Sequence, residues 1–357
     1  MVHVYLIVAW ILSLFVYKLP NEKIRSSLRI GFFILFVLAM LREGFGNDYY
    51  SYEKIFIDAH KDINSANIEI GFFELNKIFP NYHLLLASLA FVFLFATYRL
   101  IVTNVNVRYQ WISMFIFIFN PYLFLMSLSS LRQILVISFF VIILSVEYKS
   151  KVSKIVLSFV CLLLCTQFHQ TAWLLIPVCV YFYLDKTKNV VRLERLFFII
   201  TPIILIVFND LFNSLIFYVI GLFSNNFNYL HHISISEPNT LRATLLTLIY
   251  YVYVLINLNK LEGSAYRYSR LYLIGLMFAI LAFRYNMFTR FQMYFDLFSI
   301  VSLPSIFQLC REKSEGVSKV INVYIFPGLI LIIYLLRYYS FFSNVLWESF
   351  FEYNSIL

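Results

Sequence analysis

Charged residues are scarce in this 357-residue chain, where Asp, Glu, Lys and Arg together make up only 13% of the sequence. Roughly 25% is usual in a soluble globular protein. Hydrophobic residues make up 61%, and many apolar blocks approach the ~20 residues that cross a bilayer. These blocks do not alternate apolar and polar residues, as the strands of a β-barrel do. The sequence therefore predicts an all-α, polytopic integral membrane protein.

Cysteine is also rare, and the four cysteines include no CxxC pair. Cys161 and Cys165 are one helical turn apart, which could suit a metal, but free cysteines in apolar segments usually serve as small core residues. His231 and His232 are adjacent without a cluster of Cys or carboxylate at metal-ligand spacing. We therefore predict no metal and no cofactor.

The apolar blocks predict about twelve membrane spans. The first block lacks the basic start and the small-residue cleavage site of a signal peptide, so we expect it to be a retained helix. Several blocks are short, which suggests that one or two are half-helices or re-entrant segments. The predicted spans are 3–18, 27–41, 84–101, 109–126, 131–147, 152–167, 169–184, 195–209, 241–258, 270–284, 291–309 and 320–338.

The distribution of Lys and Arg predicts the orientation. With the N-terminus outside, six short inner connections hold 19 of the 28 Lys and Arg residues, as the positive-inside rule requires. The net charge of +9 then follows from topology, and nucleic acid is not expected as a partner. Both termini are predicted to lie outside, and residues 1–357 are predicted to form a single polytopic membrane domain.

Two longer segments are predicted on the outer face, at about 42–83 and 210–240. The first carries seven Asp and Glu residues together with several tyrosines, and the second contains a stretch at 211–222 that could lie as an amphipathic helix at the interface. Hydroxyl groups need acceptors, and sugar faces pack on aromatic rings. The first outer segment is therefore typical of a sugar-binding site.

Five arginines at the outer ends of predicted spans oppose the charge bias of that side. One interpretation is that each extends toward lipid headgroups. Five together favour an anion site, because guanidinium groups bind phosphate bidentately and stay charged. We expect the anion to be a lipid-linked phosphate or diphosphate. The five are Arg42, Arg132, Arg242, Arg284 and Arg290.

The motifs of this chain resemble those of the EpsG family of bacterial polysaccharide polymerases, relatives of the Wzy O-antigen polymerases. "REGFGNDYYSYEKIF" (42–56) is similar to the family signature R-x(n)-G-x-D-Y-x-x-Y-x-x-x-F, and "IEIGFFELNKIF" (68–79) is similar to its E-x-G-[FY] element. "SLSSLRQILVISFFV", "FHQTAWLLIPV" and "RFQMYF" resemble, in the family's order, its Arg-Gln, F-H-x-[ST]-A and R-x-x-x-Y-F elements. Asn47 departs from the pattern, which often has Thr or a small residue there.

The resemblance implies a GT-C-like membrane glycosyltransferase in the bacterial inner membrane, with its active site facing the periplasm. Such a protein joins undecaprenyl-diphosphate-linked oligosaccharide repeat units, as in lipopolysaccharide biosynthesis. Donor and acceptor are both lipid-linked, and the expected partners are these substrates, membrane lipid and a chain-length regulator protein. The reaction implied requires neither a metal nor a nucleotide sugar.

The expected reaction assigns roles to individual residues. His169 is the first candidate for the general base, since its unperturbed pKa lies near ~6.5, and Asp48 and Glu69 are the second and third. A structural role for a single His at a helix end is the more ordinary interpretation. Diphosphate binding falls to Arg132 and Arg290, with support from Arg42 and Arg242, and sugar binding to Tyr49, Tyr52 and Tyr294.

Several alternatives stay open at this point. Arg42 could instead pair with Asp48 and hold the outer segment, and the tyrosines could belong to the interfacial aromatic belt. A lipid-linked oligosaccharide flippase or transporter would need charges along a path through the membrane. A membrane O-acyltransferase acting on surface glycans could also use an outer His and Arg. An O-antigen ligase would share the donor but use a different acceptor.

Overall fold

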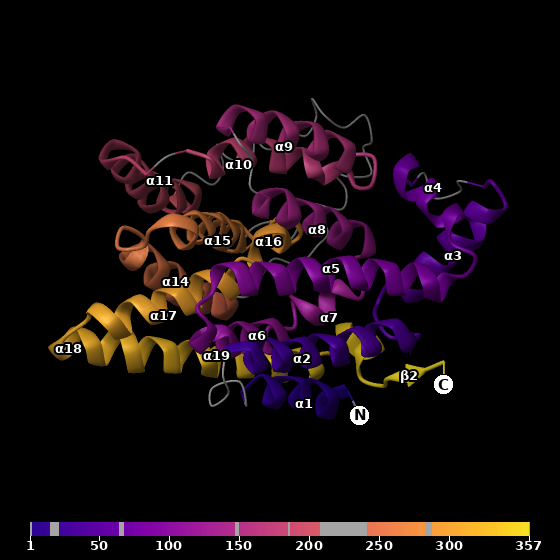
Figure 1. Cartoon of the computed structure of the whole chain (residues 1–357), viewed down its shortest axis with the longest axis horizontal. Helices are drawn as coiled ribbons and strands as arrows, with labels where there is room; N and C mark the ends of the chain where they lie inside the picture. The colour runs from indigo at the N-terminus through magenta and orange to yellow at the C-terminus, as the bar shows by residue number, and fades with distance from the viewer. Residues whose placement is uncertain are drawn as a thin grey trace. The chain divides into compact units, whose positions relative to one another are not determined.

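The computed structural model describes residues 2–14, 21–63, 68–146, 150–184, 186–207, 241–282 and 288–356. Most of these residues are helical (Figure 1). They form two compact units, one comprising Met1–Tyr183 with Leu303–Leu357 and the other Leu184–Ser302. The all-α prediction is thereby confirmed.

The first unit contains the larger set of helices. Its first half comprises α1 (Val2–Leu14), α2 (Asn21–Leu41), α3 (Tyr49–His60), α4 (Ile70–Ile78), α5 (Tyr82–Asn104), η2 (Val107–Tyr109), α6 (Gln110–Phe119), α7 (Phe124–Ser127), α8 (Leu131–Ser145), α9 (Lys151–Cys165), η3 (Gln170–Leu174) and α10 (Leu175–Phe182). Its C-terminal part comprises most of α17 (Ser299–Lys313), then α18 (Gly316–Lys319), η4 (Val320–Ile325), α19 (Phe326–Phe342) and η5 (Val345–Phe350). The second unit comprises α11 (Lys188–Val207), α14 (Leu241–Leu258), α15 (Gly263–Leu281), α16 (Phe288–Asp296) and the start of α17.

The core of the first unit is built around α5, which packs against α2 and α8. Asn81 caps the start of α5 by accepting a hydrogen bond from the Leu84 amide at 2.9 Å. Most side chains of α8 are buried, including the aliphatic run from Ile134 to Ile137. A helix that is apolar on most sides is typical of the interior of a membrane bundle.

Each predicted span coincides with one helix or with two consecutive helices. Among the described residues, two continuous helices, Tyr82–Asn104 and Gly316–Phe342, are long and apolar enough to cross a bilayer, and the pair Phe288–Asp296 and Ser299–Lys313 adds a third if it counts as one broken span. Seven shorter apolar helices have 10–17 residues. The apolar helices fit a membrane protein, whereas the number of twelve crossings and the GT-C-like class stay predictions.

The first outer segment, predicted only as a connection, folds into structure of its own. It contains the two-residue strand β1 (Arg42–Glu43) followed by α3 and α4, which pack against each other. Gly44 and Gly46 have φ values of +63° and +112°, a region that residues with a Cβ rarely adopt. These two turns place the Phe45 ring in the core, where it is fully buried. The second outer segment, including the helix expected at 211–222, lies outside the described residues.

The C-terminal tail, residues 343–356, returns to the first outer segment. Its strand β2 (Asn354–Ser355) pairs antiparallel with β1, with Arg42 opposite Ser355. The side-chain amide of Asn47 donates a hydrogen bond to the Leu346 carbonyl at 3.1 Å, and the backbone amide of Gly46 donates one to the Ser349 carbonyl at 3.2 Å. The tail therefore fixes the turn that leads into α3.

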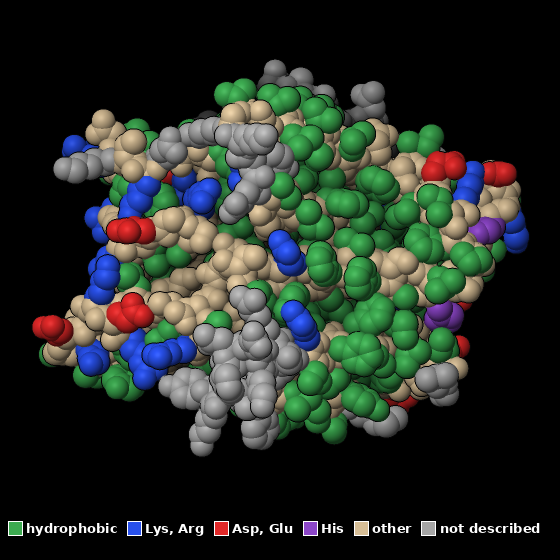
Figure 2. All heavy atoms as spheres, viewed as in Figure 1, with side chains coloured by type: hydrophobic (Ala, Val, Ile, Leu, Met, Phe, Trp, Pro, Cys, Tyr) green, Lys and Arg blue, Asp and Glu red, His purple; other side chains and the backbone are tan. Residues whose placement is uncertain are grey.

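The first unit carries its polar residues at two ends. In Figure 1, α3, α4 and β2 lie at one end of this unit and α18 lies at the other. Figure 2 shows a mainly hydrophobic surface between them, with Lys and Arg more numerous than Asp and Glu near α17 and α18 and mixed charges near α3 and α4. Which of these two ends faces which side of the membrane stays a prediction.

Candidate functional site

Three separate motif segments meet at the carboxylate of Glu69. Glu69 precedes α4, and its Oε2 accepts a hydrogen bond from Nη1 of Arg132, at the start of α8, at 2.5 Å. Its Oε1 lies 3.3 Å from Nδ1 of His169 and 3.1 Å from the backbone amide of Gln170. The Glu69 side chain is 12% exposed. One carboxylate thus orients both an imidazole and a guanidinium.

The backbone contacts beside Glu69 explain why residue 71, two positions later, is glycine. The Gly71 amide donates to the Gln167 carbonyl at 2.9 Å, which joins the start of α4 to the turn after α9. A Cβ at position 71 would lie only 2.7 Å from that carbonyl oxygen. The E-x-G element therefore has two parts. Its glutamate supplies the carboxylate, and its glycine allows the two backbones to approach closely enough for that carboxylate to reach His169.

Tyr52 of α3 joins the same group of side chains. Its buried phenol forms a hydrogen bond with the Arg132 side chain, so Arg132 lies between Tyr52 and Glu69. Burial raises the pKa of Tyr52 and keeps its phenol neutral, although the positive charge of Arg132 opposes that shift. The exposed Asp48 carboxylate is close enough to act on the Tyr52 phenol as well. We call Tyr52, Glu69, Arg132 and His169 the Glu69 cluster.

The Glu69 cluster keeps its carboxylate ionised. Burial alone would raise the pKa of Glu69, but the hydrogen bond with His169 and the charge of Arg132 outweigh it and hold this pKa at about 2. An ionised carboxylate can only accept hydrogen bonds, so Nδ1 of His169 is the donor in their contact. The Nε2 atom of a neutral His169 then carries a lone pair that can accept a proton.

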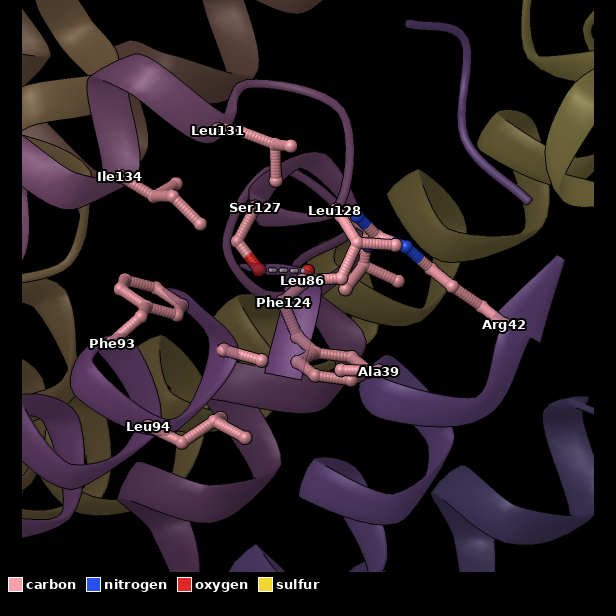
Figure 3. A pocket seen from close by; sticks show the side chains of 11 residues that line it. Ala39, Arg42, Leu86, Phe93, Leu94, Phe124, Ser127, Leu128, Leu131 and Ile134 are labelled. Atoms are coloured by element: carbon pink, nitrogen blue, oxygen red, sulfur yellow. Dashed lines mark hydrogen bonds between the residues drawn. The ribbon is translucent and has the colours of Figure 1, made fainter. Parts of the chain in front are cut away.

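A second predicted arginine of the first unit, Arg42, is buried. Arg42 is 2% exposed and reaches from β1 toward the turn that carries Ser127 and Leu128 (Figure 3). Burial lowers the pKa of Arg42 to about 10, an effect that the phenols of Tyr82, Tyr49 and Tyr353 partly offset. Three tyrosine phenols are therefore ionisable groups that act on this guanidinium, and the alternative pairing of Arg42 with Asp48 stays untested.

The cavity at Arg42 is narrow. It measures about 10 Å³, close to the smallest space that holds a water molecule, and its other walls are mainly apolar side chains of α5, α7 and α8. The Arg42 Nε has no hydrogen-bond partner among the described residues. As the cavity stands, it is too small for a diphosphate, and a role of Arg42 in binding one stays a prediction.

The family model described as the EpsG family matches residues 26–355, nearly the whole chain. This chain belongs to the EpsG family. Members of that family are Wzy-type polymerase-like, which indicates a membrane polysaccharide polymerase-like role. No curated protein and no solved structure matches the chain.

The remaining predicted site residues of this EpsG family member lie in its second unit. Arg290 and Tyr294 are both on α16, and Tyr294 is fully buried. Arg242 is at the start of α14, but its side chain is outside the described part of the structure, as is all of Arg284. Their roles in binding diphosphate or sugar stay predictions.

The tyrosines of the first unit are less accessible than a sugar subsite would suggest. Tyr49 and Tyr52 are 2% and 8% exposed, and the Tyr49 carbonyl accepts a hydrogen bond from the Tyr82 hydroxyl at 2.9 Å. Tyr50, between them in the sequence, is 67% exposed. Of the three tyrosines in this EpsG signature, Tyr50 therefore has the ring that is open to a ligand. The sequence could not distinguish it from Tyr49 and Tyr52, because all three have the same side chain.

Two other contributions to the site were not predicted. The Gln170 amide is a backbone donor at the start of η3, and no side-chain pattern identifies it. The C-terminal tail binds the signature through Asn47, the position that departs from the EpsG pattern. The unusual residue at position 47 could have indicated this contact, because a side-chain amide at a turn can form hydrogen bonds with a second segment of the chain. Among the described residues, no group of three His, Cys, Asp or Glu could hold a metal ion.

Proposed function

We propose that this EpsG family member is a polysaccharide polymerase, which joins undecaprenyl-diphosphate-linked oligosaccharide repeat units at the periplasmic face. The observation that carries the proposal is the bridge through Glu69, which holds a proton acceptor, His169, and a cation, Arg132, on the two oxygens of one carboxylate. Glycosyl transfer from a lipid diphosphate needs both groups, one at the attacking hydroxyl and one at the leaving oxygen.

The proposed reaction begins with proton transfer to His169. An acceptor sugar hydroxyl attacks the anomeric carbon of the donor, and its proton passes to Nε2 of His169, while the Nδ1–H contact with Glu69 stabilises the resulting imidazolium. The new bond joins the acceptor oxygen to the anomeric carbon. The bond from that carbon to the phosphate oxygen breaks, and undecaprenyl diphosphate leaves with the electron pair.

Arg132 stabilises the charge that develops on the leaving diphosphate. Its Nη1 donates to Glu69, and the Arg132 side chain is 26% exposed, so part of the side chain is open to a ligand. A fixed cation at this place binds the transition state better than the ground state. Arg290 and Arg242, which belong to the second unit, stay predicted phosphate-binding residues, and Arg42 is proposed as a buried source of positive potential.

The other predicted residues complete the proposal. Glu69 acts through His169 as a positioning residue, in place of its earlier candidacy as the base, and Asp48 stays the alternative base because it is exposed near Tyr52. Tyr49 and Tyr52 are proposed to support the sugar subsite of the first unit from beneath its surface, and Tyr294, in the second unit, stays a predicted sugar-binding residue. We propose the bacterial inner membrane as the location, with periplasmic termini and a chain-length regulator as partner, and a reaction without metal or cofactor.

The test is polymerisation by the purified, full-length protein. Incubated with a synthetic lipid-diphosphate oligosaccharide, it should produce a ladder of products that differ by one repeat unit. His169→Gln removes the proposed base and should slow the ladder by about 10²–10⁴-fold. Arg132→Gln removes the cation and should slow it by about 10²–10³-fold.

The matched control is Lys61→Gln, which removes an exposed cation of the same outer segment. It should leave the ladder unchanged. A ladder of normal rate from both His169→Gln and Arg132→Gln would refute the roles assigned here. Movement of the lipid-linked unit across vesicles without a ladder would instead indicate a flippase, and acyl groups on the glycan would indicate an O-acyltransferase.

A further inference from the structure

A second pocket lies away from the Glu69 cluster, at the hairpin between α17 and α19. Its volume is about 420 Å³, within the range of about 300–1,000 Å³ that is usual for ligand sites. Phe307 and Arg311 of α17 line one side, and Lys319, Val323 and Tyr324 line the other. The ring of Tyr109 packs against Phe307 at a centroid distance of 5.7 Å and supports that wall.

The two cations of this pocket are not neutralised by the acids nearby. Glu312, the residue after Arg311, accepts a hydrogen bond from the Gln308 side chain at 3.0 Å. Neither Arg311 nor Lys319 forms an ion pair within the described part of the chain. Both are exposed, so their positive charge is directed at whatever occupies the pocket.

An exposed apolar strip begins beside these cations and continues along α19. Tyr324 is 66% exposed, Ile325 50%, Leu329 41% and Ile332 54%. Tyr324 lies on η4, a six-residue π-helix, which is a rare conformation that occurs frequently at functional sites. A cationic pocket that opens onto a strip of apolar side chains matches a molecule with an anionic head and a hydrocarbon tail.

We propose that this pocket binds the headgroup of an anionic membrane phospholipid, with the acyl chains lying along the exposed face of α19. The positive-inside rule predicts this hairpin on the inner side of the membrane, where basic pockets between helices bind anionic lipid headgroups. The site is separate from the proposed polymerase reaction, because it adjoins α18, which lies at the opposite end of the first unit from α3 and α4 (Figure 1).

The proposal is tested by lipid binding to the delipidated, full-length protein. Phosphatidylglycerol, titrated in mixed micelles and counted by native mass spectrometry, should bind more tightly than phosphatidylethanolamine. Each pocket cation that contacts the headgroup should contribute about a 5-fold change in affinity for an anionic lipid. Arg311→Gln with Lys319→Gln should therefore weaken phosphatidylglycerol binding by about 25-fold and leave phosphatidylethanolamine binding unchanged.

The control variant is Lys313→Gln, which removes an exposed cation of the same hairpin that does not line the pocket. It should bind phosphatidylglycerol as the wild type does, and an unchanged thermal unfolding temperature verifies that both variants are folded. Equal binding by the double variant and by Lys313→Gln would overturn the proposal. Displacement of the lipid by millimolar inorganic phosphate would overturn it too, because the site would then recognise free phosphate.

Discussion

At the level of single residues, Glu69 determines how the candidate site is assembled. Its carboxylate bonds to side chains that lie 63 and 100 positions further along the chain. Each of its two oxygens contacts a different predicted functional group, so the distance between His169 and Arg132 depends on one short side chain. Glutamine could keep one of these contacts, but it could not accept at both positions.

The ionisation of Glu69 should make the stability of the protein depend on pH. Its folded-state pKa of about 2 lies below the ordinary value of 4.5, so the contribution of Glu69 is fully present above pH 4.5 and is lost as the pH falls toward 2. We expect the wild type to unfold at a higher temperature than Glu69→Gln at pH 7. The difference should narrow between pH 4.5 and pH 3, as measured by thermal unfolding in detergent.

The companion measurement is the same titration with Glu74→Gln, which changes an exposed acid on α4, the helix that follows Glu69. Its unfolding temperature should follow that of the wild type across the range. A difference between wild type and Glu69→Gln that stays constant down to pH 3 would mean that the carboxylate is not stabilised by its neighbours.

At the level of elements, the candidate site depends on how closely α4 approaches the turn after α9. Gly71→Ala should destabilise the protein by roughly 1–3 kcal/mol, because the added Cβ would lie 2.7 Å from the Gln167 carbonyl and the two segments would have to move apart. The same shift moves Glu69 away from His169, so polymerisation should fall as well. Chemical unfolding and the product ladder measure the two effects.

Gly328→Ala provides the matched comparison within α19. An added Cβ there meets nothing within 4 Å, and alanine is favoured over glycine inside a helix by roughly 0.5–1 kcal/mol. This variant should be at least as stable as the wild type. Equal stability of Gly71→Ala and Gly328→Ala would show that the contact between α4 and the α9 turn is looser than described.

Sequence patterns predicted the elements better than the contacts between them. Apolar blocks identify helices because burial and backbone bonding in lipid leave few other conformations. The motifs indicated Glu69, Arg132 and His169, but not that Glu69 lies between the other two, because that order depends on packing between segments far apart in the chain. Burial of Tyr49 and exposure of Tyr50 were likewise not predictable, since both have the same side chain.

At the level of the whole molecule, the charge distribution predicts which end faces which side of the membrane. A cysteine placed at Ser51 on α3 should react with a membrane-impermeant maleimide added to intact cells, whereas one placed at Ser318 on α18 should react only after the membrane is opened. Both serines are exposed. Three native cysteines, Cys165, Cys179 and Cys310, are buried and should contribute little background.

The reverse labelling pattern would place the signature on the cytoplasmic side and would remove the basis for a periplasmic reaction. Labelling of both positions in intact cells would show that the two ends are not on opposite sides of the membrane. The unsubstituted protein, which retains all four cysteines including the partly exposed Cys161, is the control.

The pairing of the C-terminal tail with the turn before α3 has a consequence for biosynthesis. Asn47 and Ser349 are bonded although 302 positions separate them, so the ribosome makes the second residue about 15–60 s after the first at 5–20 residues per second. During that interval the early helices can already be inserted while the turn lacks its partner. A nascent chain that has not yet reached residue 349 would thus occupy the membrane without an ordered signature turn, and catalytic competence would have to wait for the synthesis of that residue.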